Sequence, residues 1–460
     1  MADVQHGSAA AGAGSGGRRH LLLGAAGLAP LALLVGLAVT QGFDVAAFGV
    51  LAPEIRHSFH LDNASIDAVT ALTAAVPVMC SIFLGYFGDK GDRVRLTVIG
   101  AVLWGIAAIF TGLAPVLAVL VAARLAGGVG LLASQTIYPS LLSDYYPPEG
   151  LAQIFTVFLI GSTGLGLVGS PLAGWLGTVF GWRPTFVVLA IPTFICAALV
   201  IKMMKDPPRR TMAPSPDVVA HEAGASEAAV PIIPGMASAE PFEGTIRDGF
   251  RAVRRIRTLR RTWIAAFLFG SGTIPLATLV SDFFHDVYHV GATERGDIGA
   301  LLGVFGLIGI IIGGVISQKL VASGRTTIFP IVTAGSVIWF GVFVLIMAHV
   351  HSLSASIVAA SILAMGAVGF LPTYVTFVAI ITPAKLRSQA YAWSLFFYAL
   401  GAICLSGVIG AVADSNHNHG QRTAMSLLAF LVILGGLIGL SAKRFVKGDL
   451  AQLESDAAES

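Results

Sequence analysis

Charge is scarce in this chain of 460 residues, because Asp, Glu, Lys and Arg make up only 12% of it. A soluble globular domain carries roughly 25% charged residues. Hydrophobic residues reach 55%, and a water-soluble protein could not bury so many in one core. The solvent around most of the chain must therefore be lipid. The formal net charge of +3 is too small to indicate a nucleic-acid partner.

Cysteine is equally sparse, and the signatures of catalysis are missing. Cys80, Cys196 and Cys404 all fall inside apolar runs without metal-ligand spacing, which is typical of small core residues. No Gly-x-x-x-x-Gly-Lys-Ser/Thr signature and no catalytic constellation occurs. The "HNH" at 417–419 has no further metal ligands beside it. We therefore expect no enzyme activity, no cofactor and no metal site.

Long apolar segments account for most of the sequence. Continuous runs of this length in lipid indicate membrane-spanning helices, so we expect an all-α membrane protein with twelve spans. Cutting at charges and turn residues places them near 21–52, 66–88, 95–113, 115–144, 150–180, 184–203, 262–288, 296–322, 327–349, 353–382, 386–413 and 422–442.

The basic residues predict which side of the membrane each loop faces. With both termini inside, 23 of the 28 Lys and Arg residues fall on the cytoplasmic face. The apolar run after Arg18 and Arg19 continues too far for a cleaved signal peptide, so this pair is expected to hold the first span on that face. The prediction is a multi-pass protein of the cell membrane with both termini cytoplasmic.

A polar stretch near 204–261 divides the spans into six plus six, and the two halves resemble each other. "YPPEGLAQIF" (146–155) is similar to "TPAKLRSQAY" (382–391), and "GYFGDK" at 85 to "GVISQK" at 314. Such repetition is typical of transporters, with the substrate site between the halves. The expected units are a disordered terminus (1–20), two pseudo-symmetric six-helix bundles (21–203 and 262–442), a linker with a basic amphipathic helix (204–261) and a tail (443–460).

The stretch "GYFGDKGDRVRL" (85–96) carries the most informative motif. It resembles the loop motif Gly-x-x-x-Asp-Arg/Lys-x-Gly-Arg-Arg/Lys of the major facilitator superfamily, with Asp92 in place of a Gly and Val94 in place of a basic residue. The resemblance implies that this loop latches the two halves in the outward-facing state. It assigns to the latch Gly85, Asp89, Lys90, Arg93, Arg95, Asp144 and Arg387.

The same resemblance implies two specific latch contacts. Asp89 is expected to meet the amino end of span eleven near Arg387, where a helix terminus favours a carboxylate. Arg93 is expected to pair with Asp144 at the cytoplasmic end of span four. The departure at Asp92 is expected to weaken the geometry of the turn.

Two ionisable residues, Asp44 and Arg124, fall deep inside spans. Asp44 lies about nine residues, or roughly 14 Å, from the outer end of span one, and Arg124 is at a similar depth in span four. A charge at that depth is costly and indicates a functional site, although a purely structural salt bridge remains an alternative. "LVAARLAGGVG" also resembles the superfamily's span-four motif, whose arginine is tied to proton coupling. We expect Asp44 and Arg124 to couple transport to protons.

Span five contains "GLGLVGSPLAGW" (164–175), which resembles the exporter motif Gly-x-x-x-Gly-Pro-x-x-Gly-Gly. Gly166, Pro171 and Gly174 match it, while Ser170 and Trp175 depart from it. These residues are expected to permit close helix packing and a kink. Asp282, His285 and Asp286 lie near the outer end of span seven, as either a gate or a wetted helix end.

The basic run "RDGFRAVRRIRTLRR" (247–261) spaces its apolar residues every three positions. This pattern predicts a helix on the inner membrane surface, with arginines that attract anionic headgroups. A simple topological anchor explains the run equally well.

The amino half most resembles the spinster group of sphingolipid and lysolipid transporters, through "RLAGGVGLLASQTIYPSLLSDYYP" (124–147) and "KDPPRR" (205–210). Val45 and Leu131 stand where that group carries Arg and Glu, which predicts a more apolar pocket. The residues expected to line it are Phe43, Phe48, Gln135, Tyr138, Tyr374, Trp393 and Phe396.

These observations predict a monomeric, proton-coupled secondary transporter that exchanges protons for an amphipathic or hydrophobic small molecule, such as a lysolipid or drug-like compound. Export is favoured over import. Two alternatives stay open: a proton-coupled symporter that imports a small metabolite, and an uncoupled membrane sensor or lipid scramblase. Membrane lipids and protons are the other expected partners.

Overall fold

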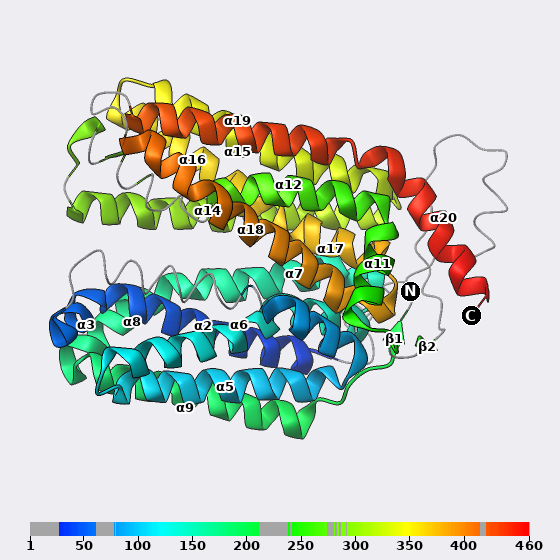
Figure 1. Cartoon of the computed structure of the whole chain (residues 1–460), viewed down its shortest axis with the longest axis horizontal. Coiled ribbons are helices and arrows are strands. Elements are labelled where there is room, and N and C mark those ends of the chain that lie inside the picture. The colour runs from blue at the N-terminus through cyan, green and yellow to red at the C-terminus, as the bar shows by residue number, and fades with distance from the viewer. Residues whose placement is uncertain are drawn as a thin grey trace, which may run out of the picture.

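The computed structural model is almost wholly helical, as the long apolar runs predict (Figure 1). Helix is the expected conformation because lipid offers no partner for free backbone groups. The structure describes residues 27–60, 78, 80–210, 238–239, 242–273, 280, 283–284, 287–290, 292–414 and 420–459. Within these residues, nine helices are long and apolar enough to cross a membrane, and each of the twelve expected spans contains helical residues.

The first half supplies the first six spans. After α2 (Ala29–Val50), the chain makes a short helix α3 (Ala52–Phe59). The second span is described as helix over 80–90. The remaining elements are α5 (Arg93–Leu113), α6 (Leu117–Tyr145), α7 (Pro148–Leu159), the π-turn η2 (Ile160–Gly164), α8 (Leu165–Phe180) and α9 (Trp182–Met203).

The second half repeats this plan. Its tenth span is broken at Phe370, just before Pro372, which lacks the N–H that a continuous helix needs. The elements are α12 (Arg257–Thr273), α14 (Ala292–Ala322), η4 (Thr326–Ile328), α15 (Phe329–His349), α16 (Leu353–Gly369), α17 (Leu371–Ile381), η5 (Ala384–Leu386), α18 (Arg387–Asp414) and α19 (Gly420–Leu440).

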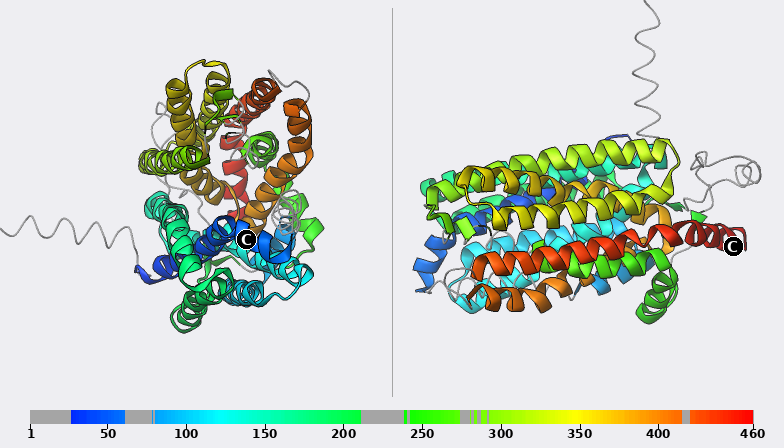
Figure 2. Two further views of the ribbon diagram at one scale, coloured as in Figure 1. Left: turned by 90° about the vertical axis from the view of Figure 1, so that its left-hand side faces the viewer. Right: turned by 90° about the horizontal axis from the view of Figure 1, so that it is seen from above.

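The two halves lie side by side with their helices roughly parallel to one long axis (Figures 1 and 2). Each has its own core: one cluster centres on Leu34 and Tyr138, and another on Phe283 and Phe340. The halves meet through α7 against α14 and α17, and through α6 against α18. Large apolar residues elsewhere stay exposed, among them Phe430 at 64%, as lipid-facing residues should be.

The linker and the carboxyl tail form small elements at one end of the bundle (Figure 1). We call this the linker end and the opposite one the distal end. The linker contributes the antiparallel strands β1 (Arg209–Arg210) and β2 (Ser238–Ala239) and the helix α11 (Ile246–Arg255). The tail forms α20 (Lys443–Glu459).

The basic run at 247–261 differs from a single surface helix. It breaks at Ile256 into α11 and the start of α12. Val253 and Leu259 are fully buried in a core cluster that also contains Trp263. The apolar face therefore packs on protein and is not available to insert into lipid.

Candidate functional site: a buried ion pair and a closed latch

The deepest charges of the first half form an ion pair. Arg124 Nη1 on α6 lies 2.7 Å from Asp44 Oδ2 on α2. Asp44 is 2% exposed, and the Arg124 side chain is 11% exposed. Asp44 is about 9 Å from the end of α2, and Arg124 about 10 Å from the start of α6, at 1.5 Å per residue. The pair thus lies in the distal third of both helices rather than at their middle.

Two aromatic rings hold the arginine from the other side. The Arg124 guanidinium carbon is 4.2 Å from the centre of the Phe48 ring and 5.7 Å from that of Phe186 on α9. A cation over an aromatic face is stabilised most where water is excluded. Arg124 therefore keeps favourable contacts if Asp44 becomes neutral.

Several buried polar atoms on α2 and α6, the two helices that carry the pair, have no hydrogen-bond partner among the described residues. They are the second oxygen of Asp44, both amide atoms of Gln41 and the hydroxyl of Tyr138. The Gln41 side chain is close enough to Tyr138 to influence its hydroxyl, and both residues are 0% exposed. Buried polar atoms without partners require an explanation such as internal water, bound ligand or a functional role. The site has spare hydrogen-bonding capacity for a proton or a water molecule.

At the linker end, two carboxylates join the halves. Asp89 accepts hydrogen bonds from the backbone N–H groups of Ser388 and Gln389, both at 2.9 Å, at the start of α18. Asp144 accepts from Arg93 of its own half and from Arg387 of the other half, both at 2.5 Å. All these side chains are 0–1% exposed. These contacts close the linker end.

Glycine permits the close approach that the latch needs. A Cβ at Gly85 would lie 2.5 Å from the Ala392 Cβ and 2.9 Å from the Ser388 carbonyl oxygen. The other two motif cations face outward: Lys90 donates to Tyr86, and Arg95 pairs with Asp92 at 3.1 Å. Neither makes a hydrogen bond or ion pair with the part of the other half that the structure describes.

Asp92 has a local role that the loop motif did not indicate. Its Oδ1 accepts from the backbone N–H of Arg95, which makes it the N-cap of α5. Asp is among the best N-cap residues. The expectation that Asp92 weakens the turn is wrong, because its side chain satisfies a free N–H of the helix.

The linker adds residues that the sequence analysis missed. Arg93 also contacts Asp206, with 3.0 Å between its Nη2 and Oδ1. Arg209 donates to the carbonyl oxygens of Gly88, Asp89 and Gly91, and so caps the second span. The available signal was "KDPPRR", directly after the sixth span.

The seven residues expected to line the substrate pocket lie in different environments. Gln135 is exposed, and Phe43 packs against Gly169 of α8. Phe48 lies under Arg124, and Tyr138 meets Phe158 edge-on. In the second half, Trp393 contacts Phe250 of α11 and Phe396, and Tyr374 contacts Phe370. The indole N–H of Trp393 is buried with no hydrogen-bond partner among the described residues.

Among the described glycines of α8 in the fifth span, the closest helix contacts are made by two residues that the motif did not indicate. A Cβ at Gly169 would lie 2.6 Å from Phe43, and one at Gly177 2.3 Å from Leu51, whereas one at Gly174 would make an ordinary 3.7 Å contact with Val50. The backbone of Gly166 and Pro171 is helical in α8, while their surroundings lie outside the described residues, as do Asp282, His285 and Asp286.

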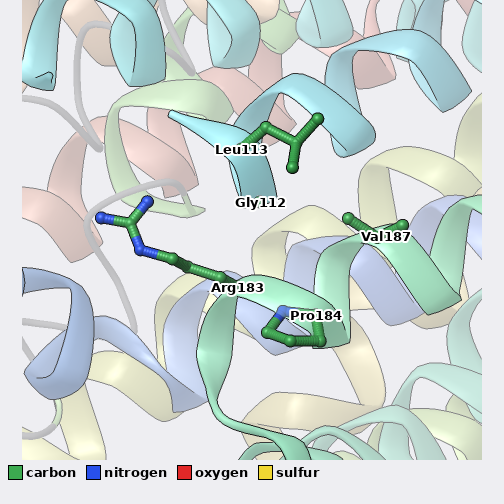
Figure 3. Close-up of a pocket in the computed structure, with 5 residues that line it drawn as sticks. All are labelled: Gly112, Leu113, Arg183, Pro184 and Val187. Atoms are coloured by element: carbon green, nitrogen blue, oxygen red, sulfur yellow. The ribbon is translucent and has the colours of Figure 1, made fainter. Parts of the chain in front are cut away.

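A shallow pocket of about 360 Å³ opens at the distal end, where α5 ends and α9 begins (Figure 3). It is lined by Gly112, Leu113, Arg183, Pro184 and Val187. The Arg183 guanidinium donates to the Ala114 carbonyl oxygen and stacks on Trp182 at 4.3 Å. This pocket contains none of the predicted site residues. Nor does any group of three or more His, Cys, Asp or Glu residues that could hold a metal occur in the described part of the chain.

Comparison with known proteins agrees with this architecture. The model of the Major Facilitator Superfamily matches residues 33–403. The chain belongs to the major facilitator superfamily. It is therefore a multi-pass membrane transporter and not an enzyme.

Solved structures of this superfamily share the fold at low sequence identity. A bacterial homologue of the human lysosomal transporter spinster, in an inward-facing and unoccupied conformation, aligns over 91% of this chain and 97% of its own, with a TM-score of 0.56 and 18% identity. The human organic anion transporter MFSD10 aligns over 89% and 98%, with a TM-score of 0.66 and 12% identity.

Among curated relatives, the lincomycin resistance protein of Streptomyces lincolnensis is 31% identical over 180 residues, which are 38% of this chain and 37% of that protein. The quinolone resistance protein NorB of Staphylococcus aureus (strain JH9) is 26% identical over 148 residues, 32% of each chain. The matches thus span about a third of the length of these relatives.

Proposed function

We propose that this transporter is a proton-coupled exporter of amphipathic or hydrophobic small molecules, with Asp44 as the proton site. The observation that carries the proposal is the Asp44–Arg124 ion pair, buried inside the helices of the first half. A carboxylate enclosed there exchanges between a charged form paired with Arg124 and a neutral form. That exchange is the chemical change that a proton-driven cycle needs.

The latch supports a place for Asp44 in such a cycle. With the linker end closed through Asp89 and Asp144, proton and substrate exchange would occur from the distal end. Protonation of Asp44 would weaken its hold on Arg124 and so loosen α2 from α6. Rocking of the halves would then expose the site to the linker end, which we assign to the cytoplasm from the excess of Lys and Arg there.

Export of drug-like compounds is supported by the two resistance proteins among the relatives. A hydrophobic or amphipathic substrate fits this site better than a small anion, because Arg124 is already held by Asp44 and two aromatic rings. We further propose that the protein acts as a monomer in the cell membrane, with protons, lipids and a small molecule as its partners.

The test is transport in proteoliposomes under an imposed pH gradient. Lincomycin, norfloxacin and lysophosphatidylcholine serve as labelled probes. We expect at least one probe to move against a proton flux in the wild type, and Asp44→Asn to lose gradient-driven flux while keeping downhill exchange. Glu54→Gln, an exposed carboxylate on α3, is the matched control and should behave as wild type.

Three other outcomes separate the rival functions. Substrate flux in the same direction as the proton flux would indicate a symporter instead. Flux that ignores the gradient and persists unchanged in Asp44→Asn would indicate an uncoupled sensor or scramblase. If a folded Asp44→Asn variant coupled transport to protons as well as the wild type does, Asp44 would not be the proton site.

A further inference from the structure

The end of the linker contacts the first half at the latch. The Phe242 backbone N–H donates to the Asp89 carbonyl oxygen at 3.3 Å. Its ring meets Tyr86 edge-on, with centroids 6.5 Å apart. Both partners belong to the "GYFGDK" segment that forms the latch. The linker is thus attached to the same turn whose carboxylate binds α18.

Seven residues later, the same segment contacts the second half. A Cβ at Gly249 would lie 1.9 Å from Gln389 Oε1, so α11 packs directly on the Gln389 side chain, and any larger residue at 249 must displace the end of that side chain. The Phe250 ring is 4.3 Å from Trp393 and stacks on Trp263. Gln389 is one of the two residues whose backbone N–H binds Asp89. Residues 242–253 therefore bridge both halves beside the latch hydrogen bonds, and we call them the linker bridge.

The outer face of α11 and of the following turn is dense in arginine. Val253 and Leu259 are buried on the inner side. Asp248, an acid on the same helix, accepts hydrogen bonds from Thr245 in a capping box. Its Oδ1 lies 3.8 Å from Arg251 Nη1, so it neutralises this arginine only weakly. The exposed arginines are Arg247, Arg251, Arg254, Arg255, Arg257, Arg260 and Arg261. At the linker end of α12, this surface lies where phospholipid headgroups begin.

We propose that the arginine face of α11 binds the headgroups of anionic phospholipids, and that this binding holds the linker bridge on the latch and favours the state closed at the linker end. The occupant is a lipid headgroup because the charge is displayed beside a membrane span, while the apolar face needed for deeper insertion is already used inside the protein. The inference rests on the proposed function only in taking the latch as the gate of the transport cycle.

The experiment measures latch closure directly. The full chain, with Cys80, Cys196 and Cys404 replaced by serine, carries spin labels at Lys202→Cys and Lys385→Cys, two exposed positions on opposite halves. It is placed in nanodiscs of phosphatidylcholine alone or with 30% phosphatidylglycerol. We expect the anionic lipid to raise the ratio of closed to open distances at least fivefold, and less so at high salt because screening shortens the reach of the charges.

Charge-removing variants of two basic surfaces at the linker end test the proposal. Replacing Arg247, Arg251, Arg254 and Arg255 with glutamine should abolish the response, whereas replacing Lys443, Arg444 and Lys447 of α20 should leave it. Gly249→Phe should keep the lipid binding but lose the shift, because a ring at this buried position cannot be accommodated by moving the Gln389 side chain alone and so lifts α11 from Gln389. A lipid response that survives in the four-arginine variant, or that never appears in the wild type, would overturn the proposal.

A soluble anion tests whether the arginine face binds a phosphate group only in a lipid headgroup or also as a free anion. Glycerol 3-phosphate at the same headgroup concentration should leave the closed-to-open ratio unchanged in phosphatidylcholine nanodiscs. If it reproduced the effect of phosphatidylglycerol, the face would bind free anions and the lipid assignment would fall. Because the readout needs neither substrate nor a proton gradient, its failure is separable from failure of proton-coupled export.

Discussion

At the scale of single residues, Asp44 and Arg124 make sense only as a pair. Removing one partner leaves an uncompensated buried charge, at a cost of about 3–5 kcal/mol, whereas removing both is often close to neutral. We therefore expect Asp44→Asn to lower the thermal unfolding temperature more than the double variant Asp44→Asn/Arg124→Gln. Thermal unfolding in detergent checks this order. Equal destabilisation by the two would mean that Phe48 and Phe186 alone satisfy the arginine.

Replacing Gln41, in contrast, is expected to raise the stability of the protein. Both amide atoms of Gln41 are buried without a well-formed hydrogen bond among the described residues, although the side chain lies close enough to Tyr138 to influence its hydroxyl. A buried unsatisfied polar group costs about 1–3 kcal/mol, so Gln41→Leu, which is similar in volume, should raise stability by an amount of that order. Thermal unfolding measures it, with Gln135→Leu as an exposed control. A loss of stability would show that internal water already satisfies the amide.

At the scale of elements, the approach of the second span to α18 depends on Gly85. Any side chain there must displace Ala392 or the Ser388 carbonyl, so Gly85→Val should open the linker end. Gly299→Ala on α14 is the control, because a Cβ there meets nothing within 4 Å. Alkylation of Ser388→Cys by a water-soluble maleimide should become at least tenfold faster in the Gly85 variant only. Unchanged alkylation would mean that this contact does not hold the gate.

The cap of α11 predicts a pH dependence of the linker bridge. Hydrogen bonds from the Thr245 hydroxyl and backbone N–H hold the pKa of Asp248 below its ordinary value of 3.8. A lowered pKa stabilises the capped helix above 3.8, and this stabilisation is lost as pH falls through the lowered pKa. A spin label at Arg251→Cys should therefore gain mobility only below that range. Asp248→Asn, which also caps well, should remove the transition without freeing the helix.

At the scale of the whole molecule, the sequence predicted the spans well, because lipid forces long apolar runs into helices. The latch contacts of Asp89 and Arg93 were also foreseen, since they follow a short motif. Asp206 and Arg209 were not, because "KDPPRR" marks a charged segment after the sixth span but does not show that this segment folds back onto the latch, more than a hundred residues away in the chain. Trp393 was assigned to the substrate pocket from its residue type, yet it lies against Phe250 of the linker. Such contacts depend on how whole elements pack.

One carboxylate of the latch is shared between arginines of the two halves. Asp144 binds Arg93 and Arg387, so Asp144→Asn leaves these two buried arginines facing each other across the interface, with only Arg93 keeping a carboxylate, Asp206, beside it. Repulsion between them should open the linker end, and each 1.4 kcal/mol of it changes the open-to-closed ratio about tenfold. Spin-label distances between positions 202 and 385 report that ratio. Adding Arg387→Gln to Asp144→Asn should restore part of the closure, a non-additivity that independent contacts would not produce.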